Sequence, residues 1–371
     1  MDPKNQFCHN LACSARGKRG QGNIVVHSQK EARYQCTTCG ATFTETKGTL
    51  FYRRRYTPVF LSQMLSLLAH GCPPAAIVAT FDIDARTVAA WQREAGEHCR
   101  HVHEAVVQQG HLDLGQVQAD ELRVKTQAGI VWMALAVAVG TRLWLGGVVS
   151  ARRDRALALA LALQVRACAL CRPLLICFDG FGGYGSAFRQ AFTSPLPHDG
   201  RGRPRRVAWP DIALGQVVKQ VARRQVVSVE RRIVQGSEAL VTRLLRCSQG
   251  RGVLNTAYIE RLNATFRERL AVLVRRSRAL ARTPQRLEAG MYLLGCIYNF
   301  CRWHESLRLP VYVGRGCHWV KRTPAMAAGL TDHGWSIQEL LSFKVAPPAY
   351  VPPKRCGRPP KAVALARAAW A

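Results

Sequence analysis

Three carboxylates, Asp120, Asp179 and Glu260, are the residues whose types and positions most strongly indicate chemistry. Asp120 lies in the alternating segment QVQADELRV, Asp179 follows the apolar run LLICF, and Glu260 lies in NTAYIERLNATFRERL. Carboxylates that converge repel one another unless cations bind between them, and their oxygens are the ligands that Mg²⁺ prefers. The pattern therefore predicts a site for two Mg²⁺ or Mn²⁺ ions, an arrangement that catalyses phosphoryl transfer.

The same region permits a second interpretation, because Gly180, Gly182 and Gly185 follow the apolar run as G-x-G-x-x-G, the pattern of a dinucleotide-binding turn. Such a turn belongs after the first strand of a βαβ unit, with an acidic residue about 20 positions later at a strand end. Here the strand is the fourth of its domain, and Asp199 lies in a Pro/Gly-rich segment. Asp179 would also repel a pyrophosphate, so we favour the carboxylate site.

Four cysteines near the N-terminus have the spacing of a metal site. Cys8 and Cys13 form C-x4-C, and Cys36 and Cys39 form C-x2-C. Two short cysteine pairs supply the tetrahedral sulfur ligands of a structural Zn²⁺, and the short β-like runs between them predict a zinc ribbon. His9 is an alternative ligand in place of Cys8. Metal binding would supply much of the folding free energy of so short and polar a segment.

A second C-x2-C, formed by Cys168 and Cys171, has no partner pair nearby. It ends the segment 154–171, which is rich in alanine and leucine and predicts a helix. Because an unligated cysteine behaves as a small hydrophobic residue, we expect both side chains to pack in the core.

The elements that must position the carboxylates follow one another in a simple order. Strands are predicted over 115–126, 129–139 and 142–150, then the helix 154–171 and a fourth strand over 174–179. This order predicts an α/β layer in which the first and fourth strands are neighbours, so that Asp120 and Asp179 converge.

Two neighbours of the carboxylates have their own predicted positions. Alternation along the strand directs Glu121 to the face opposite Asp120. On the helix that carries Glu260, the residues Asn263 and Arg267 share its face at i+3 and i+7, and we expect both to contact DNA.

The charge of the chain indicates a polyanionic partner. The 371 residues include 53 Lys+Arg and 23 Asp+Glu, a formal net charge of +30. This excess argues against a typical metabolic enzyme and favours nucleic acid before an anionic membrane. No secretory signal is evident, and the apolar segment 130–149 is interrupted by Gly140-Thr141-Arg142, which suggests two strands and no membrane span. We expect a cytoplasmic protein, located at the bacterial nucleoid, with reduced cysteines.

A helix-turn-helix is predicted over residues 56–105. Two short helices flank the turn FDID, and Asp84 is placed to cap the second helix. That helix carries Arg86, Thr87, Gln92 and Arg93, side chains that can read base edges in a major groove.

With these motifs the chain resembles bacterial insertion-sequence transposases of the DDE type, especially those related to insertion sequence one. The resemblance covers about residues 5–345 and is carried by YQCTTCGATFTETKGTLFYRRR, QADEL, NTAYIERLNATFRERL, NFCRWHESLRL and RTPAMAAGLTDHGWSIQELL. It implies an RNase H-like catalytic domain with Asp120, Asp179 and Glu260 as a metal-binding triad. It also implies action on double-stranded DNA, both element ends and target, by a homo-oligomer of bacterial origin.

The resulting fold expectation is a multidomain α/β protein. A zinc ribbon spans 1–55 and a helix-turn-helix spans 56–105. An RNase H-like mixed-sheet domain spans 112–310, with a basic insertion at about 193–210, and a C-terminal extension with a basic tail spans 311–371.

Two departures from the family pattern are the basic insertion and the tail. Both contain G-R-P cores, with Arg201, Arg203 and Arg358 as candidates for contacts in a minor groove, as in AT-hooks, or as parts of simple basic loops. The sequence also leaves open a second function, that of a catalytically inactive relic that binds specific DNA. It specifies neither the terminal repeat nor the target.

Overall fold

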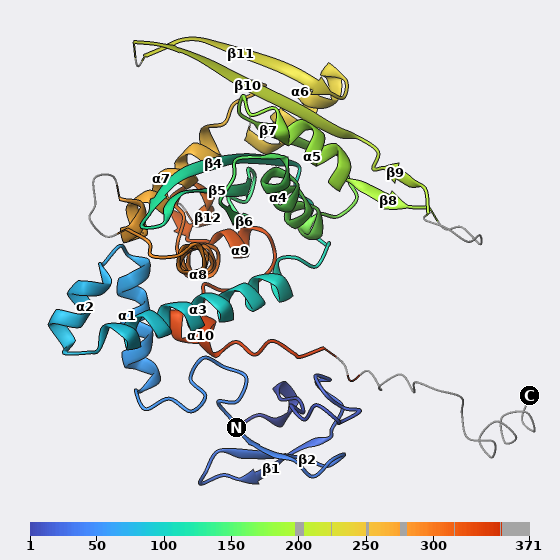
Figure 1. Cartoon of the computed structure of the whole chain (residues 1–371). Coiled ribbons are helices and arrows are strands. Elements are labelled where there is room, and N and C mark those ends of the chain that lie inside the picture. Colours follow the sequence, from blue (N-terminus) through green and yellow to red (C-terminus); the bar gives the residue numbers. More distant parts are fainter. Residues whose placement is uncertain are drawn as a thin grey trace, which may run out of the picture. The chain divides into compact units, whose positions relative to one another are not determined.

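The computed structural model describes residues 1–196, 204–223, 225–249, 252–274, 280–314, 316–348 and 350 (Figure 1). The chain divides into two compact units: Met1–Gly48 with Lys344–Ala371, and Thr49–Phe343. The predicted DNA contacts Arg201, Arg203 and Arg358 lie outside the described residues.

The first unit contains a short 3-10 helix and three strands. The helix is η1 (Pro3–Asn5), and the strands β1 (Ile24–Ser28), β2 (Arg33–Cys36) and β3 (Thr42–Thr44) form an antiparallel sheet in chain order. Its core is a small cluster, and it consists of Cys8, Cys13, Ala15, Ile24, Tyr34, Cys36 and Phe43. So little apolar burial gives this unit few interactions to hold it together without a ligand.

The second unit begins with three helices, α1 (Pro58–Ala69), α2 (Pro74–Phe81) and α3 (Ala85–Val106). The helices begin where the sequence provides caps, since the side chains of Thr57 and Asp84 accept hydrogen bonds from the first-turn amides of α1 and α3. The predicted cap at Asp84 is thus confirmed, and its Oδ1 lies 2.7 Å from the amide nitrogen of Arg86.

A mixed six-stranded sheet forms the centre of the second unit, and the chain is therefore a mixed α/β protein. The strands β4 (Gln116–Thr126), β5 (Gly129–Ala138) and β6 (Trp144–Ser150) are followed by helix α4 (Arg155–Cys168) and strand β7 (Leu174–Phe178), as predicted. In the sheet order β11-β10-β7-β4-β5-β6, the strands β4 and β7 are parallel neighbours. The apolar segment 130–149 accordingly forms two antiparallel strands.

Beyond the predicted strands the sheet continues through a long hairpin. Strands β10 (Ile212–Ala222) and β11 (Gln225–Gln235) pair with each other, and β10 also pairs in parallel with β7 (Figure 1). β11 is the edge strand, and helix α6 (Glu238–Gln249) follows it. Two short strands, β8 (Thr193–Pro195) and β9 (Arg206–Ala208), pair at the base of the basic insertion.

Helices cover both faces of this sheet. The ring of Phe178 on β7 contacts Tyr184 and Phe188 of α5 (Gly183–Ala191), and α5 packs with α4. Side chains on the other face meet α6 and α7 (Ala257–Arg269). There Gln118 accepts hydrogen bonds from the amides of Tyr258 and Ile259. The N-terminus of α7 is thereby tied to β4.

Helix α4 is shorter than predicted, because it ends at Cys168. Cys168 is buried as expected and its thiol donates to the carbonyl of Gln164, 3.3 Å away. Cys171, in contrast, lies beyond the helix and is exposed, so its expected packing in the core is wrong.

Helix α8 (Pro284–Cys296) packs closely between β6 and α3. A side chain at Gly295 would collide with the indole of Trp144, and one at Gly96 would collide with the backbone of Ala289. These two glycines therefore permit the short helix–strand and helix–helix distances.

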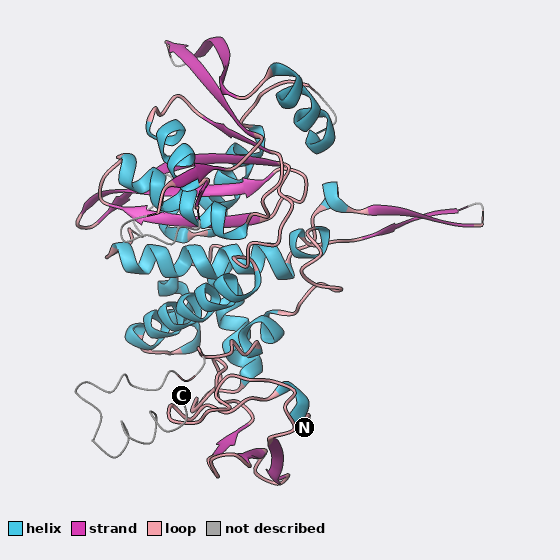
Figure 2. Cartoon of the chain, turned by 90° about the vertical axis from the view of Figure 1, so that its right-hand side faces the viewer, coloured by secondary structure: helices cyan, strands magenta, loops and turns pink. Residues whose placement is uncertain are grey.

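After α8 the chain continues through the π-helix η3 (Ile297–Cys301) and the 3-10 helix η4 (Glu305–Leu307). It then forms the hairpin of β12 (Leu309–Val313) and β13 (Gly316–Val320), which projects as a two-stranded ribbon on the right of Figure 2. The short helices α9 (Pro324–Ala327) and α10 (Ile337–Ser342) follow; a further 3-10 turn, η2 (Ala271–Leu273), lies after α7.

Candidate metal centres

The first candidate metal centre lies where β4 and β7 run side by side. The parallel register pairs Ala119 with Phe178, so Asp120 and Asp179 are the next residues on the two chains. Oxygen atoms of Asp120, Asp179 and Glu121 lie within 4.8 Å of one another. The expected convergence of Asp120 and Asp179 is thus confirmed, with Glu121 as an additional member.

Asp120 is held by two hydrogen bonds and is half-buried. Its Oδ1 accepts from the amide of Glu121 at 2.8 Å, and its Oδ2 accepts from Nδ2 of Asn263 at 2.7 Å. Burial, followed by the negative charges of Asp179 and Glu121, raises the pKa of Asp120 to about 7. A carboxylate in this state favours either a proton or a cation.

The position of Glu121 differs from the prediction, since its carboxylate reaches the cluster that we expected it to avoid. Its Oε1 accepts from Nε of Arg153 at 2.5 Å, and Nη2 of Arg153 also lies 3.6 Å from Oδ2 of Asp179. Alternation fixes only the direction of the Cα–Cβ bond. Asp179 lies one residue beyond the end of β7, outside the regular alternation, and Arg153 connects the two carboxylates.

Glu260, the third predicted carboxylate, lines the same cavity but lies outside this cluster. The cavity, of about 510 Å³, is lined by Asp120, Arg153, Asp179, Gly180, Phe181, Gly182, Val217, Val218, Lys219, Thr256 and Glu260. Glu260 pairs with Lys219 of β10, and its Oε1 accepts from the hydroxyl of Thr256 at 2.7 Å. Burial opposes ionisation, but the hydrogen bonds from Lys219 and Thr256 lower the pKa of Glu260 overall.

The carboxylate cluster has the properties of a cation site. Oε2 of Glu121 is buried and meets no donor at hydrogen-bond geometry among the described residues, although the buried hydroxyl of Tyr184 lies near enough to act on this carboxylate. Burial, followed by the charge of Asp179, raises the pKa of Glu121, although Arg153 opposes this. A buried carboxylate oxygen without a donor is unfavourable unless a proton or metal ion satisfies it. The oxygen ligands and their spacing suit Mg²⁺ or Mn²⁺.

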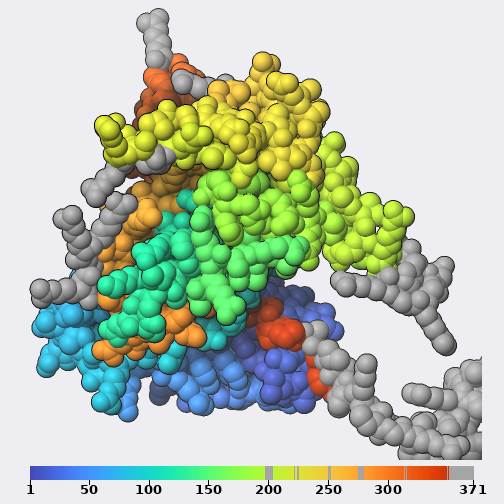
Figure 3. Space-filling view, turned by 45° about the horizontal axis from the view of Figure 1, so that its top comes forward, coloured from blue at the N-terminus to red at the C-terminus, as the bar shows by residue number. Residues whose placement is uncertain are grey.

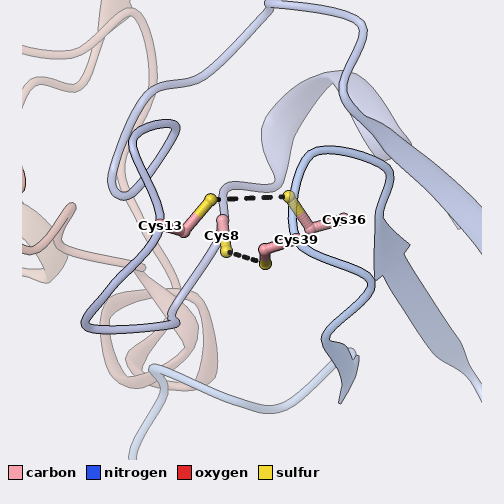
Figure 4. A group of neighbouring side chains, drawn as sticks. All are labelled: Cys8, Cys13, Cys36 and Cys39. Atoms are coloured by element: carbon pink, nitrogen blue, oxygen red, sulfur yellow. Dashed lines mark hydrogen bonds between the residues drawn. The ribbon is translucent and has the colours of Figure 1, made fainter.

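The second candidate metal centre is formed by the four predicted cysteines (Figure 4). The sulfur atoms of Cys8 and Cys39 are 3.6 Å apart, and those of Cys13 and Cys36 are 4.0 Å apart. A tetrahedron with Zn–S bonds of about 2.3 Å has sulfur–sulfur edges of about 3.8 Å, so the spacing fits Zn²⁺.

The surroundings of Cys36 favour a thiolate. Burial raises its pKa, but amides of Cys39 and Thr38 and neighbouring thiols lower it to about 7. His9, the alternative ligand, is not part of the cluster. Its ring packs beside Phe7 and Phe43, and burial lowers its pKa to about 4.

The predicted DNA contacts on α3 have different environments. Arg86 and Arg93 are exposed, and they lie two turns apart on the same side of the helix. Thr87 and Gln92 are half-buried. The amide of Gln92 lies near Gly290 of α8, at the contact between the two helices.

The two predicted DNA contacts on α7 also differ. Asn263 is 2% exposed, and its amide donates to Asp120. This position does not fit a contact with DNA; instead, Asn263 orients a carboxylate. Arg267 lies one turn further along α7 and is half-buried.

Three polar residues of the cavity were not anticipated from the sequence: Arg153, Lys219 and Thr256. Thr256 stands four residues before Glu260, a spacing at which side chains on one helical face meet, so its role was detectable. Arg153 and Lys219 come from a loop and from a strand that the sequence did not predict. Their approach depends on the fold.

Comparison with known proteins adds no family assignment: no protein-family model and no curated protein matches the sequence. Among the described residues, no helix is both long enough and apolar enough to cross a membrane. The chain is thus defined by its structure, as a mixed α/β protein with two groups of side chains that could hold metal ions, one of four cysteines and one of carboxylates.

Proposed function

We propose that this chain is a DNA transposase of the DDE type, with an RNase H-like catalytic domain, that cleaves a DNA strand and joins the resulting 3′-OH to target DNA. The observation that carries this proposal is the placement of Asp120 and Asp179 on adjacent parallel strands, at a cavity also lined by Glu260. Bound Mg²⁺ would activate the attacking oxygen and stabilise the leaving oxygen at this site.

The residues of the cavity have distinct parts in this reaction. Asp120 and Asp179 would hold the cations, and Asn263 fixes the orientation of the Asp120 carboxylate through its hydrogen bond. Glu260 would add a third carboxylate if it left Lys219, whose ammonium group could then pair with a DNA phosphate. Gly182 leaves room for the DNA backbone, since a Cβ atom there would meet no atom within 4 Å.

DNA binding is supported by two further features. The second and third helices, α2 and α3, meet at a short turn, with Arg86 and Arg93 exposed on α3, as a helix-turn-helix requires. The cysteine cluster suits a structural Zn²⁺ of a zinc ribbon, which together with this helix pair would recognise the ends of the element.

The proposal is tested by measuring strand cleavage and joining by the Asp179→Asn variant. The substrate is a DNA duplex that carries the inverted repeats flanking the gene. We expect strand cleavage and joining in Mg²⁺ to fall at least about 1,000-fold, because the site loses a charged metal ligand. DNA affinity measured without Mg²⁺ should remain within about twofold. Asp113→Asn is the matched control, since Asp113 pairs with Arg172 and does not line the cavity.

Two results would contradict the proposal. Normal joining by Asp179→Asn would show that the carboxylate site is assigned wrongly. Tight DNA binding by the unaltered chain, without metal-dependent cleavage, would instead favour the alternative of a catalytically inactive DNA-binding protein.

A further inference from the structure

The hairpin β12–β13 is exposed on both of its faces. In the antiparallel register Tyr312 and Trp319 lie on one face, and Val311 and Val320 lie on the other. Tyr312 is 76% exposed and Trp319 is 51% exposed, and all five residues of β13 are exposed. In Figure 3 the hairpin is the orange projection at the top. A two-stranded ribbon is marginal in water when nothing packs against it, so this hairpin has the properties of a binding element.

The charges of three arginines act on His304, whose amide donates to the carbonyl of Arg322 at the base of the hairpin, 3.0 Å away. Burial, followed by the positive charges of Arg142, Arg261 and Arg302, lowers the pKa of His304 to about 4. The same three arginines act on the phenol of Tyr298, whose ring centroid lies 6.1 Å from that of His304. In the part of the chain that the structure describes, none of the three pairs with a carboxylate.

Two members of this cluster are tied to helix α7, whose Glu260 lines the cavity. The guanidinium of Arg142 stacks 4.1 Å from the ring centre of Tyr258, and its Nη1 is buried without a partner among the described residues. Arg261 is exposed and directly follows Glu260 on α7. Of the three arginines, Arg261 is therefore the neighbour in sequence of a side chain that lines the cavity.

The hairpin continues the positive charge of the cluster. The guanidinium of Arg308 lies 4.3 Å from the ring centre of Trp319. From Arg308 to Arg322 the sequence contains no aspartate or glutamate. Arg308 itself pairs with Glu305, 3.2 Å away, so the unpaired positive charge belongs to the other three arginines. Like charges that gather without acidic partners are unfavourable until an anion binds them. We call the set Arg142, Arg261, Arg302, Arg308, Tyr312 and Trp319 the arginine–hairpin surface.

We infer that the arginine–hairpin surface binds duplex DNA, with the ribbon in a groove and the arginines on the phosphates. The major groove, about 12 Å wide, admits a two-stranded β-ribbon, which explains why both faces of the hairpin are bare. Exposed aromatic side chains beside arginines suit contacts with bases and phosphates. The inference rests on the proposed function. The DNA strand that enters the cavity would continue along α7 and reach the arginine–hairpin surface.

The experiment measures binding of the full-length chain to a random-sequence 30-base-pair duplex, without Mg²⁺, at several salt concentrations. We expect Tyr312→Ala/Trp319→Ala to weaken binding at least about fivefold, because the ribbon loses its contacts with phosphates and base edges in the groove. A second variant, Arg142→Gln/Arg261→Gln/Arg302→Gln, should reduce the slope of log K against log salt by about 2–3, because each phosphate contact contributes about 0.9. Arg172→Gln is the matched control, as Arg172 is exposed and pairs with Asp113.

Three outcomes would overturn the inference. One is unchanged affinity and salt slope in both variants, at melting temperatures equal to that of the unaltered chain. Another is a preference of the surface for single-stranded over duplex DNA in competition. The third is a loss of self-association in the hairpin variant, measured by sedimentation without DNA, with binding intact; this would identify a contact with a second copy of the chain.

Failure of this inference and failure of the proposed function can be told apart. If the unaltered chain does not cleave DNA in Mg²⁺ but both variants lose affinity, the DNA-binding surface stands and the transposase proposal falls. If the unaltered chain cleaves DNA and both variants bind DNA as tightly as it does, the transposase proposal stands and the arginine–hairpin surface is wrong.

Discussion

At the scale of single residues, the carboxyl group of Asp120 is subject to opposing demands. Burial, followed by the charges of Asp179 and Glu121, disfavours its ionised form, whereas hydrogen bonds from the Glu121 amide and from Asn263 favour it. A group in this balance changes its protonation near neutral pH and changes it again when a cation arrives. Two measurable consequences follow for the second unit.

Without divalent metal, the stability of the second unit should fall as the pH rises from about 4 to about 7. The pKa of Asp120 is about 7 in the folded chain and 3.8 ordinarily, so between these values the folded state holds a proton that the unfolded state has lost. Asp120→Asn should flatten this dependence and raise the melting temperature at pH 8 by several degrees, given about 2–4 °C per kcal/mol. The melting temperature of the metal-free chain, measured between pH 4 and pH 8, tests this dependence.

Added Mg²⁺ should reverse the trend, because protons compete with the metal for the same oxygens. The stabilisation by Mg²⁺ should be larger at pH 8 than at pH 5.5 and absent in Asp120→Asn. If Mg²⁺ stabilises the chain equally at both pH values, the ion binds at a site other than the Asp120 carboxylate.

Asn263→Ala distinguishes a positioning role from a contact with DNA. Loss of the hydrogen bond to Asp120 should lower the rate of cleavage about 10–100-fold, the usual effect of removing a residue that orients a metal ligand. Affinity for DNA should not change, because Asn263 is buried. If the affinity for DNA falls and the cleavage rate at saturating DNA does not change, Asn263 contacts DNA, as the sequence predicted.

At the scale of secondary-structure elements, the contact between α3 and α8 depends on Gly96. A methyl group at this position would overlap the backbone of Ala289, which cannot move without shifting α8. Gly96→Ala should destabilise the second unit by about 1–3 kcal/mol, as overpacking of a core does. Gly140→Ala is the control, because a Cβ atom there meets nothing within 4 Å. Equal denaturation midpoints for the two variants would contradict this account.

The sequence predicts those elements whose residues carry a strong local pattern. Alternation predicted β4, and continuous apolar runs predicted β5, β6 and β7. Their order predicted in turn that Asp120 and Asp179 meet. The hairpin β10–β11 and the hairpin β12–β13 were missed, because their outward residues mix apolar and basic types without a clear period.

The side chains that complete the cavity were harder to predict than its strands. Glu121 has a side chain long enough to leave the face on which its Cβ atom lies, and its destination depends on Arg153. Arg153 lies in a loop and Lys219 lies on a strand absent from the prediction. The local sequence pattern predicts the face of the strand on which each Cβ atom lies. The position of a long charged side chain depends also on charged groups that are brought near it only by folding.

At the scale of the whole molecule, the two compact units should differ in what stabilises them. The first unit has a core of seven side chains, three of which are cysteines of the metal cluster. The second has a six-stranded sheet with helices on both faces. Metal ligation should therefore be decisive for the first unit only.

Removal of Zn²⁺ should abolish one of two unfolding transitions. A chelator, or Cys13→Ser, should eliminate the transition of the first unit in calorimetry and leave the midpoint of the second unit within about 2 °C. Cys171→Ser is the control, since Cys171 is exposed and outside the cluster. Zinc release titrated with a chromogenic chelator should be close to one equivalent per chain. Loss of both transitions together would show that the units do not fold independently.

The edge strand β11 has a consequence for how the protein is handled and how copies of it meet. Its outer side has no strand partner among the described residues, and Val226, Val227 and Ile233 are exposed along it. Such an edge invites strands of other molecules to add to it, the first step towards aggregation. The charged run Glu230-Arg231-Arg232 interrupts the apolar residues and acts as a gatekeeper against this growth. Solubility of the chain at high concentration thus depends on three side chains far in sequence from both metal centres.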